Sequence, residues 1–272
     1  MKMEKRDILL HDSGDYVNTS SSTKKITSLT YNVWCEDLYF EERMNYIVNI
    51  IKNSKPDVVG LVDANEACSD LISKSLGKYY SVFEVFTQNE DKSGCMLLCC
   101  KDTIELQKNT QPFYYDYPKG SRVIGADVVL KENLFKFSVL VTRLNDNPDN
   151  DHIREAQCGV LQQVTKDIKN YVMLGDFNFY SIDENGLTKL TASKDVWLEM
   201  NCPSRIKYTF DGLSNPMIKK KITVRNSRIY YASSQLEPKL LSLVGVDDIE
   251  SIGEKRVKPS LYYGLEAVFL VS

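Results

Sequence analysis

Asp176 and Asn178 stand in a short turn that follows the apolar segment 171–174 and Gly175. A carboxylate and a carboxamide at the end of a strand can orient an attacking water and stabilise the charge that develops beside a divalent cation. A polar turn after a strand is also an ordinary structural feature. The pattern by itself leaves both interpretations open.

Other residue types that often do chemistry are scarce or scattered. The chain has two histidines, and His152 stands where a polar loop meets the start of a predicted helix, so that helix capping or solvation explains it. The seven cysteines are odd in number and show no zinc-site spacing. We therefore expect reduced thiols and no structural metal.

The elements that must position the turn can be predicted from periodicity. Apolar residues at helical spacing predict a helix over 40–53, and a second helix is expected over 65–76. A third is expected over 152–169, with an inward face of Ala156, Val160, Leu161, Val164 and Ile168. Alternating or short apolar runs predict strands over 26–33, 58–62, 79–86, 95–100, 123–130, 135–142, 171–174, 222–232 and 265–271.

Strands mixed with helices in this order favour an α/β sandwich of two packed mixed sheets flanked by helices. A chain of 272 residues can bury its core as one domain. We place that domain at residues 26–272 and expect residues 1–25 to be a flexible polar arm.

Composition limits the partners and the compartment. A net charge of −3 and a pI near 5.6 disfavour bulk binding to nucleic acid, although a local basic groove stays open. Residues 219–221 are the densest basic cluster, which a solvated loop also explains. No stretch reaches the roughly 18 apolar residues that a membrane span needs, and the first residues do not resemble a signal peptide. We expect a cytoplasmic or nuclear protein, not secreted, with no membrane partner. Abundant Lys, Asn, Ile, Asp and Tyr are typical of AT-rich genomes, including some viral ones.

A series of short motifs resembles, in sequence order, the endonuclease/exonuclease/phosphatase (DNase I-like) superfamily, and within it the tyrosyl-DNA phosphodiesterase 2 branch. The first half of the series is Thr30-Tyr31-Asn32-Val33, Pro56-Asp57-Val58-Val59-Gly60-Leu61-Val62-Asp63, Val141-Thr142-Arg143-Leu144 and Gly175-Asp176-Phe177-Asn178. The second half is Asp195-Val196-Trp197, Tyr208-Thr209-Phe210-Asp211, Ser227-Arg228-Ile229-Tyr230-Tyr231, Leu240-Leu241-Ser242-Leu243-Val244-Gly245 and Pro259-Ser260-Leu261-Tyr262-Tyr263-Gly264-Leu265.

The resemblance implies a four-layer α/β sandwich with a site at one end of two facing sheets. It also implies Mg²⁺-dependent hydrolysis of phosphodiesters. In the tyrosyl-DNA phosphodiesterase 2 branch, the substrate is a tyrosine linked to a DNA 5′ end. Three polar positions of the family's site match this chain: Asn32, Asp176 and Asn178.

The other site positions depart from the family's pattern. Asp63 stands where the family has its metal-binding glutamate, which makes it a doubtful ligand because its reach is shorter by about 1.5 Å. Glu66 could substitute only if the strand end were remodelled. The remaining departures are Arg143 for a histidine, Ser227 for an aspartate, Leu261 and Tyr262 for an aspartate–histidine pair, and Tyr180 for a phosphate-contacting arginine.

These replacements predict an impaired or inactive catalyst. Leucine cannot bind a cation or orient an imidazole, and tyrosine, with a pKa near 10, is a poor proton shuttle near neutrality. Arg143 raises a sharper hypothesis, in which its guanidinium permanently replaces the cation between Asp63 and Asp176. The alternative is that Arg143 points to solvent.

Three functions stay open from the sequence. The leading one is a pseudoenzyme kept as a binding or structural protein, with no cofactor and with a protein partner near the aromatic residues 114–117 or 262–263. The second is a weak phosphodiesterase on DNA or RNA 5′ ends, which would need Mg²⁺ and use Asp63, Asp176 and Asn178. The third is a nucleic-acid binder without hydrolysis, using Lys119, Arg122 and residues 219–221.

Overall fold

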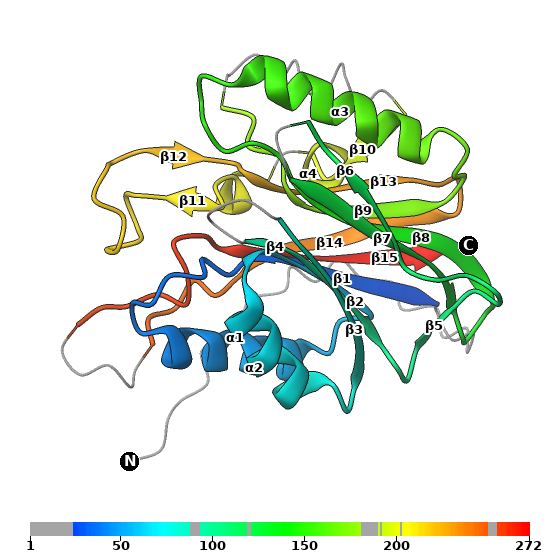
Figure 1. Cartoon of the computed structure of the whole chain (residues 1–272), viewed down its shortest axis with the longest axis horizontal. Helices are drawn as coiled ribbons and strands as arrows, with labels where there is room; N and C mark the ends of the chain where they lie inside the picture. The colour runs from blue at the N-terminus through cyan, green and yellow to red at the C-terminus, as the bar shows by residue number, and fades with distance from the viewer. Residues whose placement is uncertain are drawn as a thin grey trace, which may run out of the picture.

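The computed structural model describes residues 24–87, 93–118, 121–180, 190, 192–201, 203–249 and 255–272. Two large β-sheets face each other, with helices on their outer sides (Figure 1). Within the described residues, the first sheet has the strand order β14-β15-β1-β2-β4-β3. The bounds of these strands are β1 Lys25–Asn32, β2 Val58–Ala64, β3 Tyr80–Phe86, β4 Gly94–Cys100, β14 Leu236–Val244 and β15 Gly264–Val271.

The second sheet has the order β10-β13-β9-β8-β7-β5, and β6 also pairs with β7. The strand pairs β1–β2 and β8–β9 are parallel, and the other recorded pairs are antiparallel. The bounds are β5 Ile104–Leu106, β6 Phe113–Asp116, β7 Arg122–Leu130, β8 Phe135–Arg143, β9 Tyr171–Asp176, β10 Lys194–Asp195 and β13 Ser227–Ala232. A separate small hairpin pairs β11 Phe210–Asp211 with β12 Thr223–Val224.

The layers follow from which faces are apolar. Helices α1 Phe40–Ser54 and α2 Glu66–Leu76 pack on the outer face of the first sheet, and α3 Asp151–Thr165 packs on the second (Figure 1). A third apolar cluster fills the space between the sheets. The expected four-layer α/β sandwich is therefore confirmed. The remaining short elements are α4 Val196–Glu199 and the 3₁₀ turn Ser204–Ile206.

Gly60 in β2 shows how closely the two sheets approach. A Cβ atom added at Gly60 would lie 2.8 Å from the Cβ of Leu174 and 3.0 Å from a methyl group of Val141, both in the facing sheet. A larger side chain here would force the sheets apart and disturb the alignment of their strand ends.

The predicted helices over 40–53 and 65–76 are confirmed within one residue at each end. The side chain of Asn65 accepts a hydrogen bond from the backbone N–H of Cys68, which explains why α2 begins there. The strong apolar strands are also confirmed, with ends that shift by one or two residues.

The expectation for the third helix is partly wrong. Helix α3 ends at Thr165, and its buried residues are Ile153, Arg154, Gln157, Cys158, Leu161 and Thr165. Of the predicted inward face, only Leu161 is fully buried. The helix turns Arg154 and Gln157 inward because both side chains bind the preceding loop. Arg154 donates hydrogen bonds to the carbonyls of Asn145, Asn147 and Pro148. The side-chain oxygen of Gln157 accepts a hydrogen bond from the N–H of Asn145.

The single strand expected over 222–232 is also wrong, because β12 and β13 are separate strands in different sheets. The strands β5 and β6, of three and four residues, are too short to give a periodic signal. The expected polar arm and the loop 89–94 lie mostly outside the described residues. Lys25, placed in that arm, is the first residue of β1.

No helix in the described part of the chain is long and apolar enough to cross a membrane. Cys35, Cys68, Cys95, Cys99, Cys100 and Cys158 are all free thiols.

Candidate functional site

The ends of five strands meet at one edge of the facing sheets. In the first sheet Asn32, the last residue of β1, pairs with Val62 in β2. In the second sheet Asp176, the last residue of β9, pairs with Arg143 on one side and Ser227 on the other. This register explains why residues far apart in the sequence come together, and it places most of the predicted site residues in one cluster.

Asp176 is the buried centre of the cluster. Its side chain is 1% exposed, and its Oδ2 accepts a 2.6 Å hydrogen bond from Nδ2 of Asn32, which joins the two sheets. Its Oδ1 accepts a 2.6 Å hydrogen bond from the Ser227 hydroxyl. Burial raises the pKa of Asp176, against the opposing effects of these two hydrogen bonds and of the Arg143 charge.

Arg143 points into the cluster and is mostly withdrawn from solvent. Its Nη2 lies 3.4 Å from Oδ1 of Asp63, across the two sheets, and 2.8 Å from Oδ2 of Asp146. Its Nη1 donates a 3.1 Å hydrogen bond to the Ser93 hydroxyl. Burial lowers the pKa of Arg143, but the negative charges of Asp63, Asp146 and Asp176 outweigh it and hold that pKa above the ordinary value. The guanidinium is therefore a fixed positive charge at the strand ends.

Asp63 reaches this position through an irregular backbone. It has a φ of 57°, and the pairing of β2 with β4 shifts register between Val62 and Ala64, as in a β-bulge. The bulge turns Asp63 toward Arg143. Glu66 lies exposed in the first turn of α2 and does not take the place of Asp63.

The turn after β9 is tightly packed. Gly175 has a φ of +137°, and an added Cβ would lie 1.8 Å from the carbonyl oxygen of Thr142. Asn178, with a φ of 52°, is buried and donates a 2.8 Å hydrogen bond to the Leu144 carbonyl. The amide group of Asn178 is thus used to hold the loop after β8.

The segment 260–262 closes the cluster. The Ser260 hydroxyl donates a 2.7 Å hydrogen bond to the Asn32 carbonyl and accepts one from the Tyr262 N–H. The Tyr262 ring packs against Phe210, with 5.1 Å between ring centroids. Burial, reinforced by the Asp176 charge, raises the pKa of Tyr262, so this phenol stays protonated at neutral pH.

Tyr180 contacts the loop after β8. Its hydroxyl donates a 2.7 Å hydrogen bond to the Asp146 carbonyl, and the Arg154 guanidinium lies 5.3 Å from its ring centroid. Burial and the nearby charge of Asp146 raise the pKa of Tyr180 to about 12. Tyr180 therefore contributes no positive charge and holds the loop.

The donor set at the strand ends does not fit Mg²⁺, which requires a near-octahedral shell of oxygen atoms. Both oxygens of Asp176 accept hydrogen bonds, and the guanidinium of Arg143 lies beside Asp63. Among the described residues, no three His, Cys, Asp or Glu side chains form a group that could hold a metal ion. His152 is exposed on the first turn of α3.

Two partners of Arg143 were missed by the sequence reasoning. Ser93 lies 50 positions away in the sequence, and no local sequence pattern predicts its contact with Arg143. Asp146 lies only three positions after Arg143, so the sequence could have suggested an ion pair between them if the loop after β8 folds back.

Of the other residues singled out from the sequence, Tyr117 and Tyr263 border this cluster: the Tyr117 hydroxyl lies 2.6 Å from that of Thr142, and Tyr263 follows Tyr262 in the chain. Tyr114 and Tyr115 are exposed, whereas Tyr117 and Tyr263 are buried. Arg122 is paired with Asp116 at 2.6 Å. Residues 219–221 lie in an exposed loop, and Lys119 lies outside the described residues.

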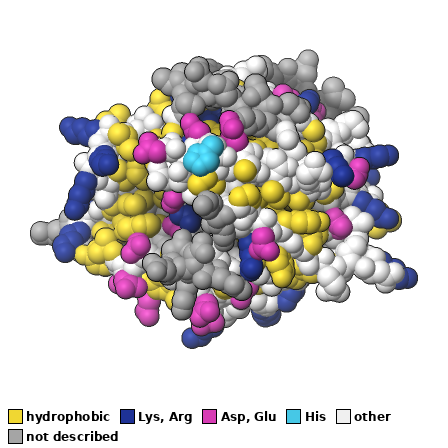
Figure 2. Space-filling model, turned by 45° about the horizontal axis from the view of Figure 1, so that its top comes forward, with side chains coloured by type: hydrophobic (Ala, Val, Ile, Leu, Met, Phe, Trp, Pro, Cys, Tyr) yellow, Lys and Arg dark blue, Asp and Glu magenta, His cyan; other side chains and the backbone are white. Residues whose placement is uncertain are grey.

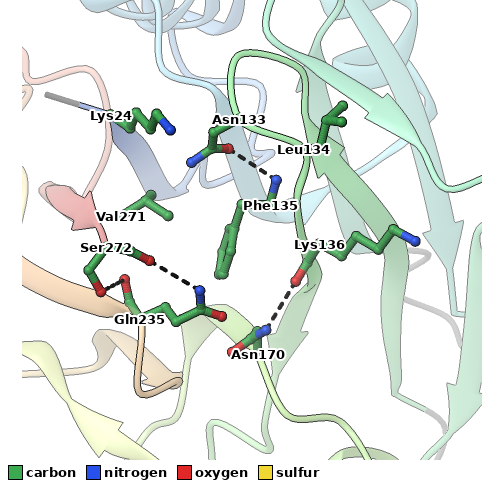
Figure 3. A pocket seen from close by; sticks show the side chains of 9 residues that line it. All are labelled: Lys24, Asn133, Leu134, Phe135, Lys136, Asn170, Gln235, Val271 and Ser272. Carbon is green, nitrogen blue, oxygen red and sulfur yellow. Dashed lines mark hydrogen bonds between the residues drawn. The ribbon is translucent and has the colours of Figure 1, made fainter. Parts of the chain in front are cut away.

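A pocket of about 420 Å³ lies at the opposite ends of the same strands, near the first residues of β8 and the end of β15 (Figure 3). Its amide groups already have partners: Asn170 donates to the Lys136 carbonyl, and Gln235 donates to the Ser272 carbonyl. No acidic side chain lines it, so it offers little chemistry.

Comparisons with known proteins agree with this geometry. A sequence model of the Endonuclease/Exonuclease/phosphatase family matches residues 29–214. No curated protein matches the chain at a significant level. Among solved structures, TDP2 of D. rerio complexed with single strand DNA product is 18% identical, with a TM-score of 0.79, over 90% of this chain and 98% of that one.

Two further structures share the fold. Truncated TDP2 of Caenorhabditis elegans is 18% identical, with a TM-score of 0.76, over 92% of this chain and all of that one. The human Nocturnin catalytic domain with bound sulfate is 17% identical, with a TM-score of 0.70, over 92% and 94% of the two chains. At these identities the likeness concerns the fold.

Proposed function

The chain belongs to the Endonuclease/Exonuclease/phosphatase family, and on that premise we propose that it is a non-catalytic member kept as a binding or structural protein. Its fold is similar to that of TDP2. The scaffold holds its strand ends in register, while the side chains there form a self-contained network.

One observation carries the proposal: the guanidinium of Arg143 lies 3.4 Å from Asp63, between the two sheets. Two carboxylates at a strand end need a cation, because adjacent buried negative charges are costly. In this chain the cation is the guanidinium of Arg143, a side chain of the protein itself. A divalent ion would have to displace it and also replace the two donors to Asp176.

The three positions 227, 261 and 262 also offer no suitable group for the proton chemistry of hydrolysis. The Ser227 hydroxyl donates a hydrogen bond to Asp176, and the Leu261 side chain has no polar group. Tyr262 has a raised pKa and therefore remains neutral near pH 7. A missing general acid–base group typically lowers a rate by 10²–10⁴-fold, so activity on phosphodiesters is expected to be very low.

The retained function is then binding to another macromolecule, and we favour a protein partner. Tyr114 and Tyr115 are 58% and 46% exposed on β6, and aromatic side chains commonly anchor protein interfaces. Nucleic acid is the second candidate partner, since a TDP2 structure of the same fold holds a single strand DNA product.

The direct test is an assay with a 5′-tyrosyl oligonucleotide and Mg²⁺ or Mn²⁺, comparing the natural chain with Asp176→Ala. We expect no turnover above that of Asp176→Ala, and no rise in Tm when either metal is added. Circular dichroism establishes that both proteins are folded. Turnover that Asp176→Ala abolishes would overturn the proposal and favour a weak metal-dependent phosphodiesterase acting on 5′ ends.

A further inference from the structure

The hairpin of β11 and β12 projects from one end of the molecule, outside both large sheets (Figure 1). Its loop, residues 212–222, is folded by its own hydrogen bonds. Asp211 Oδ1 accepts from the N–H of Leu213 at 2.9 Å, and the N–H of Gly212 donates to the Ile222 carbonyl at 2.8 Å. An added Cβ at Gly212 would lie 2.0 Å from the Lys220 carbonyl oxygen, so the two arms touch. We call residues 205–224 the basic finger.

The inner side of the basic finger is fixed to the folded domain. Asn215 is 1% exposed and donates hydrogen bonds to the carbonyls of Ser260 at 2.9 Å and Leu261 at 3.3 Å. The Phe210 ring packs against Tyr262. The finger is thus held in one orientation relative to the sheets, and its outer side is a defined surface.

The outer side combines positive charge with aliphatic side chains. Leu213 is 70% exposed and Ile222 is 46% exposed. The finger carries five cationic residues and one carboxylate, in a chain whose net charge is −3. Four of the cationic residues are Lys207, Lys219, Lys220 and Lys221, which are exposed and form no ion pair within the described residues. Figure 2 shows Lys and Arg side chains gathered around hydrophobic ones at the end of the molecule where Figure 1 places β11 and β12.

We infer that the outer side of the basic finger binds the surface of a membrane that contains anionic lipid. Lysines attract anionic headgroups, while exposed Leu and Ile side chains enter the boundary between headgroups and acyl chains. Such contact needs no membrane-spanning segment. The search for apolar stretches long enough to span a membrane therefore does not test it. It is also independent of whether the strand-end cluster is catalytic.

The same charges could attract nucleic acid, but the apolar groups favour lipid. Single-stranded nucleic acid is bound by aromatic side chains that stack on bases, in a groove that follows the backbone. The exposed large apolar side chains of the finger, Leu213 and Ile222, are aliphatic. Of its two rings, Phe210 packs against Tyr262, and Tyr208 is partly buried with Lys207 Nζ 5.1 Å from its centroid.

The test is co-sedimentation of the purified chain with vesicles of phosphatidylcholine alone and of phosphatidylcholine mixed with phosphatidylserine. We expect binding only to the mixed vesicles, weakening as salt increases. The variant Lys219→Gln/Lys220→Gln/Lys221→Gln should bind about a hundredfold more weakly, since each lysine near an anionic surface contributes about a factor of five. Leu213→Ser/Ile222→Ser should weaken binding about tenfold or more.

A matched control, Lys108→Gln/Lys136→Gln/Lys166→Gln, removes the same charge from exposed lysines elsewhere and should bind like the natural chain. Equal losses in control and finger variants would overturn the inference, because binding would then follow net charge alone. Absence of phosphatidylserine-dependent binding by the natural chain would also overturn it. So would finger-dependent binding to a single-stranded oligonucleotide without binding to vesicles, which would assign the finger to nucleic acid.

Discussion

Replacing Arg143 by alanine removes the one positive charge that the described residues place in the strand-end cluster. The change deletes the contact of the guanidinium with Asp63 at 3.4 Å and with Asp146 at 2.8 Å. It also removes the charge that opposes the raised pKa of Asp176. If the guanidinium stands in for a cation, the variant should be clearly less stable at neutral pH.

The size of the effect follows from exposure. The side chains of Arg143 and Asp63 are 22% and 15% exposed, between a surface pair and a fully buried pair. Breaking a buried pair costs about 3–5 kcal/mol, and a surface pair contributes about 0–1 kcal/mol. The contact with Asp146, which is 57% exposed, adds little. We therefore expect the free energy of unfolding to fall by about 2–3 kcal/mol.

The loss should depend on pH in a defined direction. Because burial raises the pKa of Asp176, the native state binds more protons than the unfolded state between the unfolded pKa, about 3.9, and the native pKa. Stability therefore falls as pH rises through that window. Without Arg143 the native pKa moves higher still, so the difference between variant and natural chain is small in acid and largest near neutrality.

Urea unfolding followed by circular dichroism, at pH 7 and near pH 4.5, measures both quantities. The matched control is Arg122→Ala, which breaks an ion pair with Asp116, a side chain that is 68% exposed, and a 3.2 Å hydrogen bond to the Phe86 carbonyl. It should cost about 1 kcal/mol at either pH. A double variant with Asp63→Asn should recover part of the loss of Arg143→Ala. Equal effects of Arg143→Ala and Arg122→Ala at pH 7, or a loss that does not shrink in acid, would refute the stand-in role.

Three further variants test the strand ends and helix α3. Asp176→Asn should change the free energy of unfolding by no more than about 1 kcal/mol at pH 7, because the Ser227 hydroxyl can accept a hydrogen bond from the new amide. In the same unfolding measurement, it should flatten the fall in stability with rising pH. An unchanged slope of stability against pH would contradict its assignment to Asp176. Gly159→Ala in α3 should raise stability by about 0.5–1 kcal/mol, since an added Cβ meets no atom within 4 Å. Gly175→Ala should lower stability by at least about 2 kcal/mol because of its φ and the contact with Thr142, and Tm values of the two variants that shift in the same direction would be inconsistent with this packing.

The local elements with strong periodicity were predictable from the sequence. The helices over 40–53 and 65–76 each turn one apolar face toward the first sheet, with Met44 and Ile47 from the first helix and Ile72 from the second in the same cluster. The helical spacing of such residues can be read directly from the sequence. Helix α3 was predicted with the wrong face because Arg154 and Gln157 are buried by hydrogen bonds to a loop, an arrangement that hydrophobicity alone does not reveal. The break between β12 and β13 likewise depends on which sheet each strand joins.

The candidate site divides in the same way. The sequence alone identified the residue types at the strand ends, because Asn32, Asp63, Arg143, Asp176 and Ser227 fall in ordered short motifs. It left open whether Arg143 points to solvent or inward. Only the tertiary structure decided that, since the guanidinium reaches Asp63 through the packing of one sheet on the other and through a bulge in β2. Side-chain direction at a strand end depends on register and on contacts between sheets, and neither is a local property of the chain.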